Sequence, residues 1–414
     1  MDKKFLLEDS KQFCMFPWVH LFVTPKGDAY PCCSHSFQKP LGNVKSESMI
    51  NIFNSDDLKK LRLDMLNSKP NKTCEFCYNF EENGGGSLRK YSREMFSKHF
   101  DDVVTSTAED GSVPDFKLKY IDIRFNNICN FKCRTCGGEY SSQWAIEDYT
   151  KKKKLGGLTN SDNDFTILEA DPTGRLLKET MSHLDHVDMV YFAGGEPMLS
   201  EEHYILLEEM IRLGRKDILL RYNTNASTLK FKNKDILELW SHFDRVEVSS
   251  SIDHYGERAE WIRHGTNWGE VETNLRLFRS LPNVNFQINT VLSVFNYLTL
   301  TDFYEYLVKN DFCRADDFHH YLVATPRPEF YSTTALPVNL KNPGTEKIKK
   351  YLESLKGTNF TVVMNNLKIA LEHTNSANTW EANKFRFKEI VNELDGLRGE
   401  NMVSVFPELS SLMD

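Results

Sequence analysis

Between about residues 115 and 325, short β-rich apolar runs alternate with longer amphipathic stretches. The runs that predict strands are Leu118–Phe125, Val187–Ala193, Ile218–Asn223, Arg245–Ile252, Val284–Leu292 and His319–Ala324. The stretches that predict helices are Glu201–Leu213, Lys234–His242, Glu270–Leu281 and Leu300–Lys309. This alternation indicates βα units around a parallel sheet. We therefore expect an α/β fold, and five or six such units favour a partial (β/α)6 TIM-type barrel over a sandwich.

The regions on either side have different patterns, so we expect three domains. Residues 1–100 hold five cysteines, several turn signals and one helical stretch near Ser55–Asn67, which indicates a separate metal-binding domain. Residues 115–325 form the expected barrel. Residues 330–414 are mainly helical and contain no cysteine, and we see no titratable cluster there. We expect that segment to be a helical cap on the barrel or a lid over the substrate.

Composition and charge narrow the class of protein. The 414 residues carry a net charge of −8, which gives no reason to expect a nucleic-acid or anionic-membrane partner. The N-terminus lacks the apolar stretch of a secretory signal, and no window approaches the roughly 18 apolar residues of a membrane span. We expect a cytoplasmic protein. Thiols stay reduced in that compartment, so the nine cysteines predict metal ligands and not disulfides.

Three cysteines lie in one short loop directly after the first predicted strand. They are Cys129, Cys133 and Cys136, in the run Cys-Asn-Phe-Lys-Cys-Arg-Thr-Cys. Three thiolates can hold three irons of a 4Fe–4S cube and leave the fourth iron open to a small ligand. A structural zinc ion needs a fourth ligand close by, and none follows within this loop. The alternative is half of a zinc ribbon that is completed from elsewhere in the chain.

The second predicted strand ends in Ala193-Gly194-Gly195-Glu196-Pro197. Two glycines remove side chains where a ligand must approach the end of a strand closely. The carboxylate of Glu196 can accept a charge-assisted hydrogen bond from an ammonium group. In β/α barrels the chemistry lies at the carboxyl ends of the strands, which is where both this segment and the cysteine loop fall.

Together these segments resemble the radical S-adenosylmethionine (SAM) enzymes, whose signature is C-x3-C-x2-C after the first barrel strand. The resemblance implies that Cys129, Cys133 and Cys136 hold a 4Fe–4S cluster whose open iron chelates SAM. Reductive cleavage of SAM then yields the 5′-deoxyadenosyl radical. The residue before the last cysteine is usually aromatic in the family and is Thr135 here. The Gly-Gly-Glu-Pro segment of the family lines the methionine amino group.

Later strands carry polar residues at positions that the family uses for the cofactor. Many relatives have Thr-Asn-Gly at the end of the third strand, where this chain has Thr-Asn-Ala. The fourth strand ends in Ser-Ser-Ile-Asp, which resembles the family's Ser-Ile-Asp segment. Taken singly, each residue could equally cap an element or bond within the core. As a series, the residues expected at the cofactor are Gly194, Gly195, Glu196, Pro197, Asn225, Ser251, Asp253, Arg263 and Asn289.

The N-terminal cysteines form a second set. Cys14, the pair Cys32–Cys33, Cys74 and Cys77 can supply four thiolates to one cluster or one zinc ion. Spacing alone favours zinc. The pattern resembles the auxiliary-cluster domain called SPASM, or its short form called twitch, which usually follows the barrel and here precedes it. This resemblance implies one auxiliary 4Fe–4S cluster with ligands Cys14, Cys32, Cys74 and Cys77, although Cys33 could replace Cys32.

The resemblance implies an oxidoreductase or modifying enzyme that draws one electron from an external flavodoxin or ferredoxin. The adenosyl radical would remove a hydrogen from a peptide or protein side chain, and the auxiliary cluster would assist the oxidation. A small hydroxylated metabolite, such as a sugar or an aminocyclitol, is the alternative substrate for a dehydrogenase or epimerase. A zinc-stapled β/α binding protein without radical activity is the alternative of another class. Cys313, near the end of the barrel region, is expected to be a core residue.

Overall fold

The computed structural model describes residues 2–34, 39–82, 86–151, 167–314, 320–323 and 328–414. The chain divides into two compact units. Unit 1 consists of Met1–Asn127, Leu168–Arg221 and Glu238–Arg245, and unit 2 of Ile128–Ile167, Tyr222–Leu237 and Val246–Asp414. None of the helices in the described ranges has the length and apolar character that a bilayer crossing requires.

Unit 1 is built on parallel strands. β4 (Tyr120–Ile123) pairs in parallel with β6 (Met189–Phe192) on one side and with β1 (His20–Val23) on the other. β1 also pairs antiparallel with β2 (Asp28–Tyr30), which pairs with β3 (Gly42–Asn43). The N-terminal segment thus continues the sheet of the first barrel strand. The sequence pattern did not predict β1.

Helices with one apolar stripe complete unit 1. In α3 the side chains of Leu58, Leu61 and Met65 recur at helical spacing and are buried, whereas acidic residues occupy its first turn. The helices are α1 (Phe16–Val19), α2 (Met49–Phe53), α3 (Asp56–Leu66), α4 (Glu75–Glu82), α5 (Leu88–Phe96), α6 (Phe100–Val103), α8 (Arg175–Met181) and α9 (Glu201–Arg212). β7 (Leu219–Thr224) and α10 (Ile236–Trp240) have residues in both units.

Unit 2 contains the other parallel strands. β12 (Val284–Val291) lies between β10 (Val246–Ser251) and β13 (His320–Val323), with Ser251 opposite Asn289 in the register. Two short antiparallel pairs accompany them, β5 (Lys132–Cys133) with β11 (Arg263–His264) and β8 (Lys230–Phe231) with β9 (Lys234–Asp235). The pair of β5 and β11 matters most for the site because β5 belongs to the cysteine loop.

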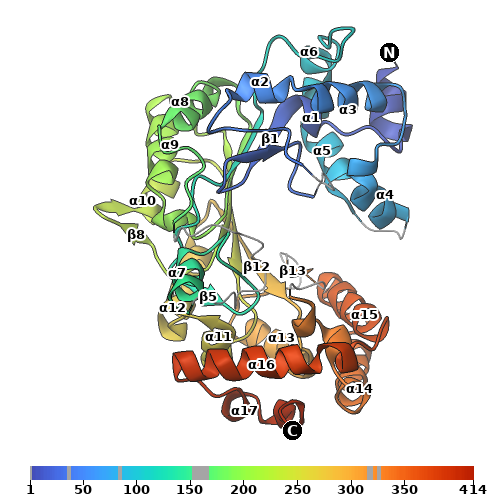
Figure 1. Ribbon diagram of the computed structural model, residues 1–414, viewed down its shortest axis with the longest axis vertical. Coiled ribbons are helices and arrows are strands. Elements are labelled where there is room, and N and C mark those ends of the chain that lie inside the picture. Colours follow the sequence, from blue (N-terminus) through green and yellow to red (C-terminus); the bar gives the residue numbers. More distant parts are fainter. Residues whose placement is uncertain (1, 35–38, 83–85, 152–166, 315–319, 324–327) are drawn as a thin grey trace. The chain divides into compact units, whose positions relative to one another are not determined.

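Unit 2 contains the whole C-terminal segment and its helices, which are orange to red in Figure 1. They are α7 (Ser142–Lys151), α11 (Gly256–Ile262), α12 (Trp268–Ser280), α13 (Leu300–Lys309), α14 (Val338–Ser354), α15 (Thr361–Asn375), α16 (Trp380–Arg398) and α17 (Met402–Val405). The predicted α/β class, with parallel strands and a helical C-terminal segment, is confirmed, and each of the six predicted strands is present. The ends of the last predicted strand, His319 and Ala324, lie outside the described residues.

Candidate functional site

The central cysteine loop runs from Cys129 to Cys136 in unit 2. Its middle forms β5, in which Cys133 lies opposite Arg263 of β11. The loop then tightens into a turn in which the Cys136 N–H donates to the Cys133 carbonyl at 3.0 Å. Ahead of β5, the Phe131 N–H points at the Cys129 sulfur at 3.5 Å. Burial raises the pKa of Cys136 to about 12 and also raises that of Cys133. Metal binding as thiolates would therefore release protons.

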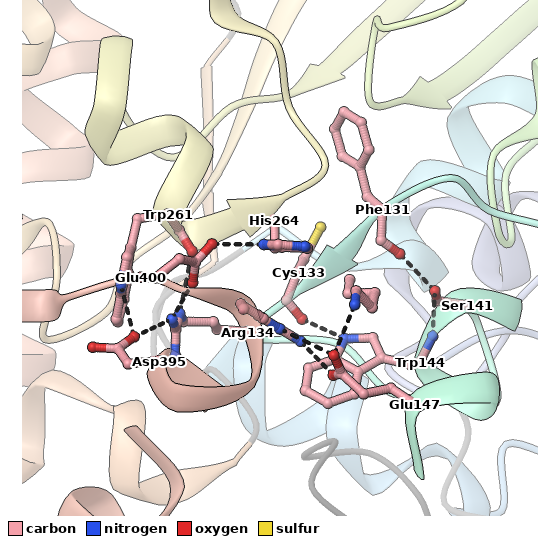
Figure 2. Close-up of polar contacts among 12 residues, drawn as sticks. Phe131, Cys133, Arg134, Ser141, Trp144, Glu147, Trp261, His264, Asp395 and Glu400 are labelled. Carbon is pink, nitrogen blue, oxygen red and sulfur yellow. Dashed lines mark hydrogen bonds and ion pairs between the residues drawn. The ribbon is translucent and has the colours of Figure 1, made fainter. Parts of the chain in front are cut away.

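Helix α7 holds one side of this loop (Figure 2). The Trp144 indole N–H donates to the Cys133 carbonyl at 2.7 Å, and the Ser141 hydroxyl donates to the Phe131 carbonyl at 2.6 Å. Glu147, one turn further along α7, binds Lys132 of β5 at 2.7 Å. Ser141, just before α7, and Trp144 within it thus bind two backbone carbonyls of the loop, and the Cys133 carbonyl also accepts the Cys136 N–H.

Arg134, directly after Cys133, is fully buried. Its Nη2 binds Asp395 of α16 at 2.6 Å and Glu400 at 2.5 Å, and its guanidinium lies 3.4 Å from the Trp261 ring centre. The Glu400 carboxylate also pairs with His264 of β11 at 2.6 Å (Figure 2). Burial alone would raise the pKa of Glu400, but His264 and Arg134 hold it below its ordinary value. The expectation that the C-terminal segment has no titratable cluster is therefore wrong.

Arg263 lies against the central loop from β11. Its Nη1 donates to the Cys133 sulfur at 3.7 Å, while Nε and Nη2 bind the buried Asp253 carboxylate at 2.9 and 3.0 Å. Asp253 also accepts the Val291 N–H at 2.8 Å, at the end of β12. The carboxylate fixes the guanidinium, so the N–H group that reaches Cys133 is held in one direction.

The other expected cofactor residues of unit 2 are at strand ends. The Asn225 amide, after β7, donates to the side chain of Asn130 in the cysteine loop at 2.9 Å. Ser251 and Asn289 lie opposite one another at the ends of β10 and β12. The Asn289 amide oxygen is buried, and within the described residues no hydrogen bond reaches it. Unit 2 therefore brings Asn225, Asp253 and Arg263 to the cysteine loop, and Asn289 offers an unsatisfied acceptor.

The Gly-Gly-Glu-Pro segment lies in unit 1. Gly195, Glu196 and Pro197 line a cavity together with Asn126 and His203. The Glu196 side chain is buried and accepts the Met198 N–H at 3.2 Å. Other residues that line this cavity are Ile123, Phe125, Phe192, Ala193 and Ser200. The segment thus presents a buried carboxylate at the carboxyl ends of β4 and β6.

Gly194 shows why this segment needs glycine. It has a φ of +128°, and a β-carbon there would lie 3.0 Å from Cδ of Arg124. Arg124 in turn forms an ion pair with Asp122 of β4, a fully buried carboxylate. Burial raises the pKa of Asp122 to about 6, although Arg124 opposes this shift.

A second cavity of unit 1 is lined by Cys14, Cys32, Cys74 and Cys77. Cys33 does not line it, and its side chain is exposed. The remaining wall is largely apolar and consists of Phe16, Pro17, Pro31, Ser34, Leu61, Met65, Thr73, Leu88 and Arg89. In a 4Fe–4S site each thiolate binds a different iron, so the ligands must surround a space. Four soft thiol donors around one cavity fit that group.

The walls of this cavity fix both the thiols and one positive charge. Cys14 shares a hydrogen bond with the Ser92 hydroxyl at 3.1 Å, and burial raises its pKa to about 12. Burial also raises the pKa of Cys74 to about 11. Arg89 is held by the Ser10 carbonyl at 2.8 Å and by Glu81. Its guanidinium would offset part of the negative charge of a thiolate-bound cluster.

Cys313 belongs to neither of the two cysteine sets. Cys313 is buried, as expected for a core residue. In the described part of the chain, no group of three or more His, Cys, Asp or Glu side chains is arranged to hold one metal ion.

Comparisons with known proteins identify two domains. Residues 14–78 match SPASM, an iron–sulfur cluster-binding domain, and residues 123–307 match the radical SAM superfamily. The first span contains all five N-terminal cysteines, and the second contains the central loop and the Gly-Gly-Glu-Pro segment. The order predicted from the sequence, with the auxiliary domain ahead of the barrel, is confirmed.

Solved structures resemble the chain only distantly, and no curated protein matches it. "Native anSMEcpe with bound AdoMet" is 19% identical over 57% of this chain and 61% of that chain, with a TM-score of 0.37. Streptococcus suis SuiB bound to S-adenosylmethionine is 14% identical over 73% and 64%, with a TM-score of 0.38. SuiB bound to precursor peptide SuiA is 14% identical over 74% and 65%, with a TM-score of 0.38. The chain thus spans less than two thirds of the length of each of these three chains.

The two domain matches also define the cofactors. A radical SAM domain implies a 4Fe–4S cluster with SAM, and an SPASM domain implies an auxiliary iron–sulfur cluster. The cysteine sets described above fall one in each domain. With an SPASM domain ahead of a radical SAM domain, this chain is an enzyme of the radical SAM superfamily.

Proposed function

We propose that this enzyme cleaves SAM reductively and uses the 5′-deoxyadenosyl radical to remove a hydrogen atom from a peptide or protein side chain. One auxiliary 4Fe–4S cluster would assist the oxidation. A single observation carries the proposal: one chain combines a C-x3-C-x2-C loop, held by contacts along its length, with a separate cavity lined by four thiols. The first set suits a cluster with one open iron, and the second a fully ligated cluster.

Cys129, Cys133 and Cys136 would hold the central cluster. When bound, that cluster supplies the electron that breaks a carbon–sulfur bond of SAM. The protein's part is to bind, orient and exclude water, because the difficult chemistry belongs to the cofactor. The contacts of α7 and β11 with the loop would keep the three thiols in place. Arg263 would place a positive charge beside Cys133.

SAM itself would be held by polar groups at the strand ends. The buried carboxylate of Glu196 suits the methionine ammonium group, and the glycines before it leave room for close approach. In unit 2, the unsatisfied Asn289 oxygen suits a hydroxyl or amino donor. Asn225, Ser251, Asp253 and Arg263 complete the proposed set, although the structure already engages Asp253 and Arg263 with each other.

The cavity lined by four thiols supports the proposal that the substrate undergoes a net oxidation. A substrate radical that loses one electron and one proton becomes a product with two fewer hydrogens, counting the hydrogen taken by the adenosyl radical. Cys14, Cys32, Cys74 and Cys77 would hold the acceptor for that electron, and a flavodoxin or ferredoxin in the cytoplasm would supply the electron for SAM cleavage. We propose residues 1–100 as the auxiliary domain, 115–325 as the barrel and 330–414 as the C-terminal domain.

The substrate class rests on the family. Radical SAM enzymes with auxiliary clusters modify peptides and proteins, or oxidise alcohols on sugars and aminocyclitols. We place a peptide or protein side chain first. A candidate peptide that loses two hydrogen atoms in a SAM-dependent reaction, measured by mass spectrometry, would support it. The same change on a hydroxylated metabolite, with peptides unchanged, would favour the second class.

The test of SAM cleavage needs no substrate. Anaerobically purified enzyme with dithionite and SAM should release 5′-deoxyadenosine, and the triple variant Cys129→Ala, Cys133→Ala, Cys136→Ala should release none. Cys33→Ala is the matched control, because it removes an exposed thiol that lines neither site. If the triple variant still released 5′-deoxyadenosine, the assignment of the central loop would be wrong.

A further inference from the structure

The C-terminal segment contacts the central cysteine loop directly at one place and helix α7 beside the loop at another. At the first, Asp395 and Glu400 bind Arg134, the residue that follows Cys133. At the second, Arg398 binds Glu147 of α7 at 2.8 Å. We call Asp395, Arg398 and Glu400 the C-terminal anchor.

The second contact reaches the loop through α7. Arg398 lies 4.6 Å from the Trp144 ring centre, and the indole of Trp144 donates to the Cys133 carbonyl. Glu147, the partner of Arg398, also binds Lys132, the residue before Cys133. The anchor therefore acts on both sides of Cys133.

These contacts are made away from solvent. The exposed fraction of the Arg134 side chain is 0% and that of Arg398 is 1%, so neither guanidinium can turn to water for a partner. Lys132, Arg134 and Arg398 are matched by Glu147, Asp395 and Glu400, which makes three cations and three carboxylates. Removal of one member leaves an uncompensated buried charge, which is far more costly than the loss of an exposed pair.

The backbone fixes the two carboxylates of the anchor. Helix α16 ends at Arg398, and Gly399, which caps it, has a φ of +66° that turns the chain back. The Glu400 N–H then donates to the Asp395 carbonyl at 3.0 Å, and the Met402 N–H donates to the Asp395 carboxylate at 2.6 Å. The Trp261 indole donates to the same carboxylate at 3.0 Å. Asp395 is thus held by three neighbours and offers Arg134 an acceptor of fixed direction.

We propose that the C-terminal anchor is a positioning element for the central cluster, which holds the loop from Cys129 to Cys136 in the arrangement that the cluster needs. Its residues act through Arg134 and α7 and do not touch the cofactor. This role differs from that of a cap or lid, because SAM cleavage would depend on residues that are distant in sequence from the cysteine loop. The inference rests on the proposed function in one respect, that this loop binds the cluster.

The test compares two variants that keep side-chain size and remove charge. Asp395→Asn with Glu400→Gln neutralises both acceptors of Arg134. Glu408→Gln is the matched control: Glu408 also joins the C-terminal segment to α11, through Arg258 at 2.6 and 3.0 Å, but these contacts do not involve the loop. Both variants should keep the wild-type circular dichroism spectrum. If the double variant fails to fold, the single Asp395→Asn variant, which retains Glu400, takes its place.

The first measurement is hydrogen exchange of the metal-free protein. Amides of residues 131–136, including the Arg134 N–H that donates to the Ile262 carbonyl at 2.9 Å, should exchange about tenfold faster or more in the double variant and at the wild-type rate in the control. The second is the anaerobically reconstituted protein. The double variant should lose the SAM-induced change in its electron paramagnetic resonance spectrum and most of its 5′-deoxyadenosine release.

Two outcomes would overturn the inference. Unchanged exchange in the double variant would show that the anchor does not hold the loop. Faster exchange with normal iron content and a normal SAM response would show that the cluster does not depend on it. A wild-type enzyme that fails to cleave SAM would instead refute the proposed function, and the exchange experiment on metal-free protein would still report on the contact itself.

Discussion

The guanidinium of Arg263 donates to the sulfur of Cys133 across 3.7 Å. Its remaining nitrogens bind Asp253, so the donor toward the sulfur cannot swing away without breaking a buried ion pair. The family resemblance placed Arg263 among the residues expected at the cofactor. The structure gives it a contact with a proposed cluster ligand, and this contact has a measurable electronic consequence.

Arg263→Lys should lower the reduction potential of the central cluster. A hydrogen-bond donor to a ligating sulfur stabilises the more negative reduced state, and lysine lacks the planar fork that binds Asp253 and reaches Cys133 together. The loss of charge-assisted bonds should also cost about 1.5–3 kcal/mol of stability. A redox titration monitored by electron paramagnetic resonance measures the first effect. Arg258→Lys, at the Glu408 pair, is the control, and an equal potential in both variants would argue against the contact.

Cys32→Ala and Cys33→Ala should differ, although the residues are neighbours. Cys32 lines the four-thiol cavity and Cys33 does not. We expect Cys32→Ala to lower the iron content by up to about four atoms per chain, because a cluster with a missing ligand is held poorly. Cys33→Ala should keep the wild-type content. Iron and sulfide analysis of anaerobically purified protein decides the matter, and the reverse result would make Cys33 the ligand.

Asp122→Asn should remove a pH dependence of the protein's stability. Because the folded-state pKa is raised to about 6 from 3.8, ionisation of Asp122 costs stability. The wild type should therefore lose stability as pH rises from about 4 to about 6, by as much as about 3 kcal/mol, and remain level above that range. The variant should lack this fall. Urea unfolding of metal-free protein across that range gives the comparison, and parallel curves for both proteins would contradict the expectation.

Ala226→Gly should stabilise the protein. Ala226 is buried at a φ of +58°, the left-handed region that favours glycine. The relief of that strain exceeds the entropic cost of glycine, so we expect a gain of about 1 kcal/mol. Thermal unfolding measures it. Gly396→Ala, at an open position inside α16, is a control for the general effect of exchanging these residues, since no atom lies within 4 Å of its added β-carbon.

The sequence pattern predicted the parallel strands well because each has a strong local signal. Val284–Leu292, for example, is a continuous β-rich run, and the strand found there is Val284–Val291. The cysteine loop could be predicted equally well, since its three ligand candidates lie within eight residues. The structure added that Cys32, and not Cys33, lines the four-thiol cavity, which depends on the direction of two adjacent side chains and not on spacing.

Contacts between residues that are far apart in the sequence could not be predicted from any local pattern. The partners of Arg134 lie 261 and 266 residues away, and an acidic residue on a helix usually predicts an exposed face. Strand β1 was missed for a related reason. It has only four residues, and its pairing partner begins 100 residues later, at Tyr120. Both the Arg134 ion pairs and the pairing of β1 depend on contacts between distant segments, which the local sequence does not specify.

The parallel pairing of β1 with β4 makes the N-terminal domain inseparable from the barrel strand that precedes the cysteine loop. A truncated chain that starts after residue 100 would expose the backbone N–H and C=O groups along one side of β4. Such a bare strand edge is a template for pairing with other molecules. Attempts to produce the catalytic part alone should therefore give aggregated protein, and the natural fusion order would serve as protection against it.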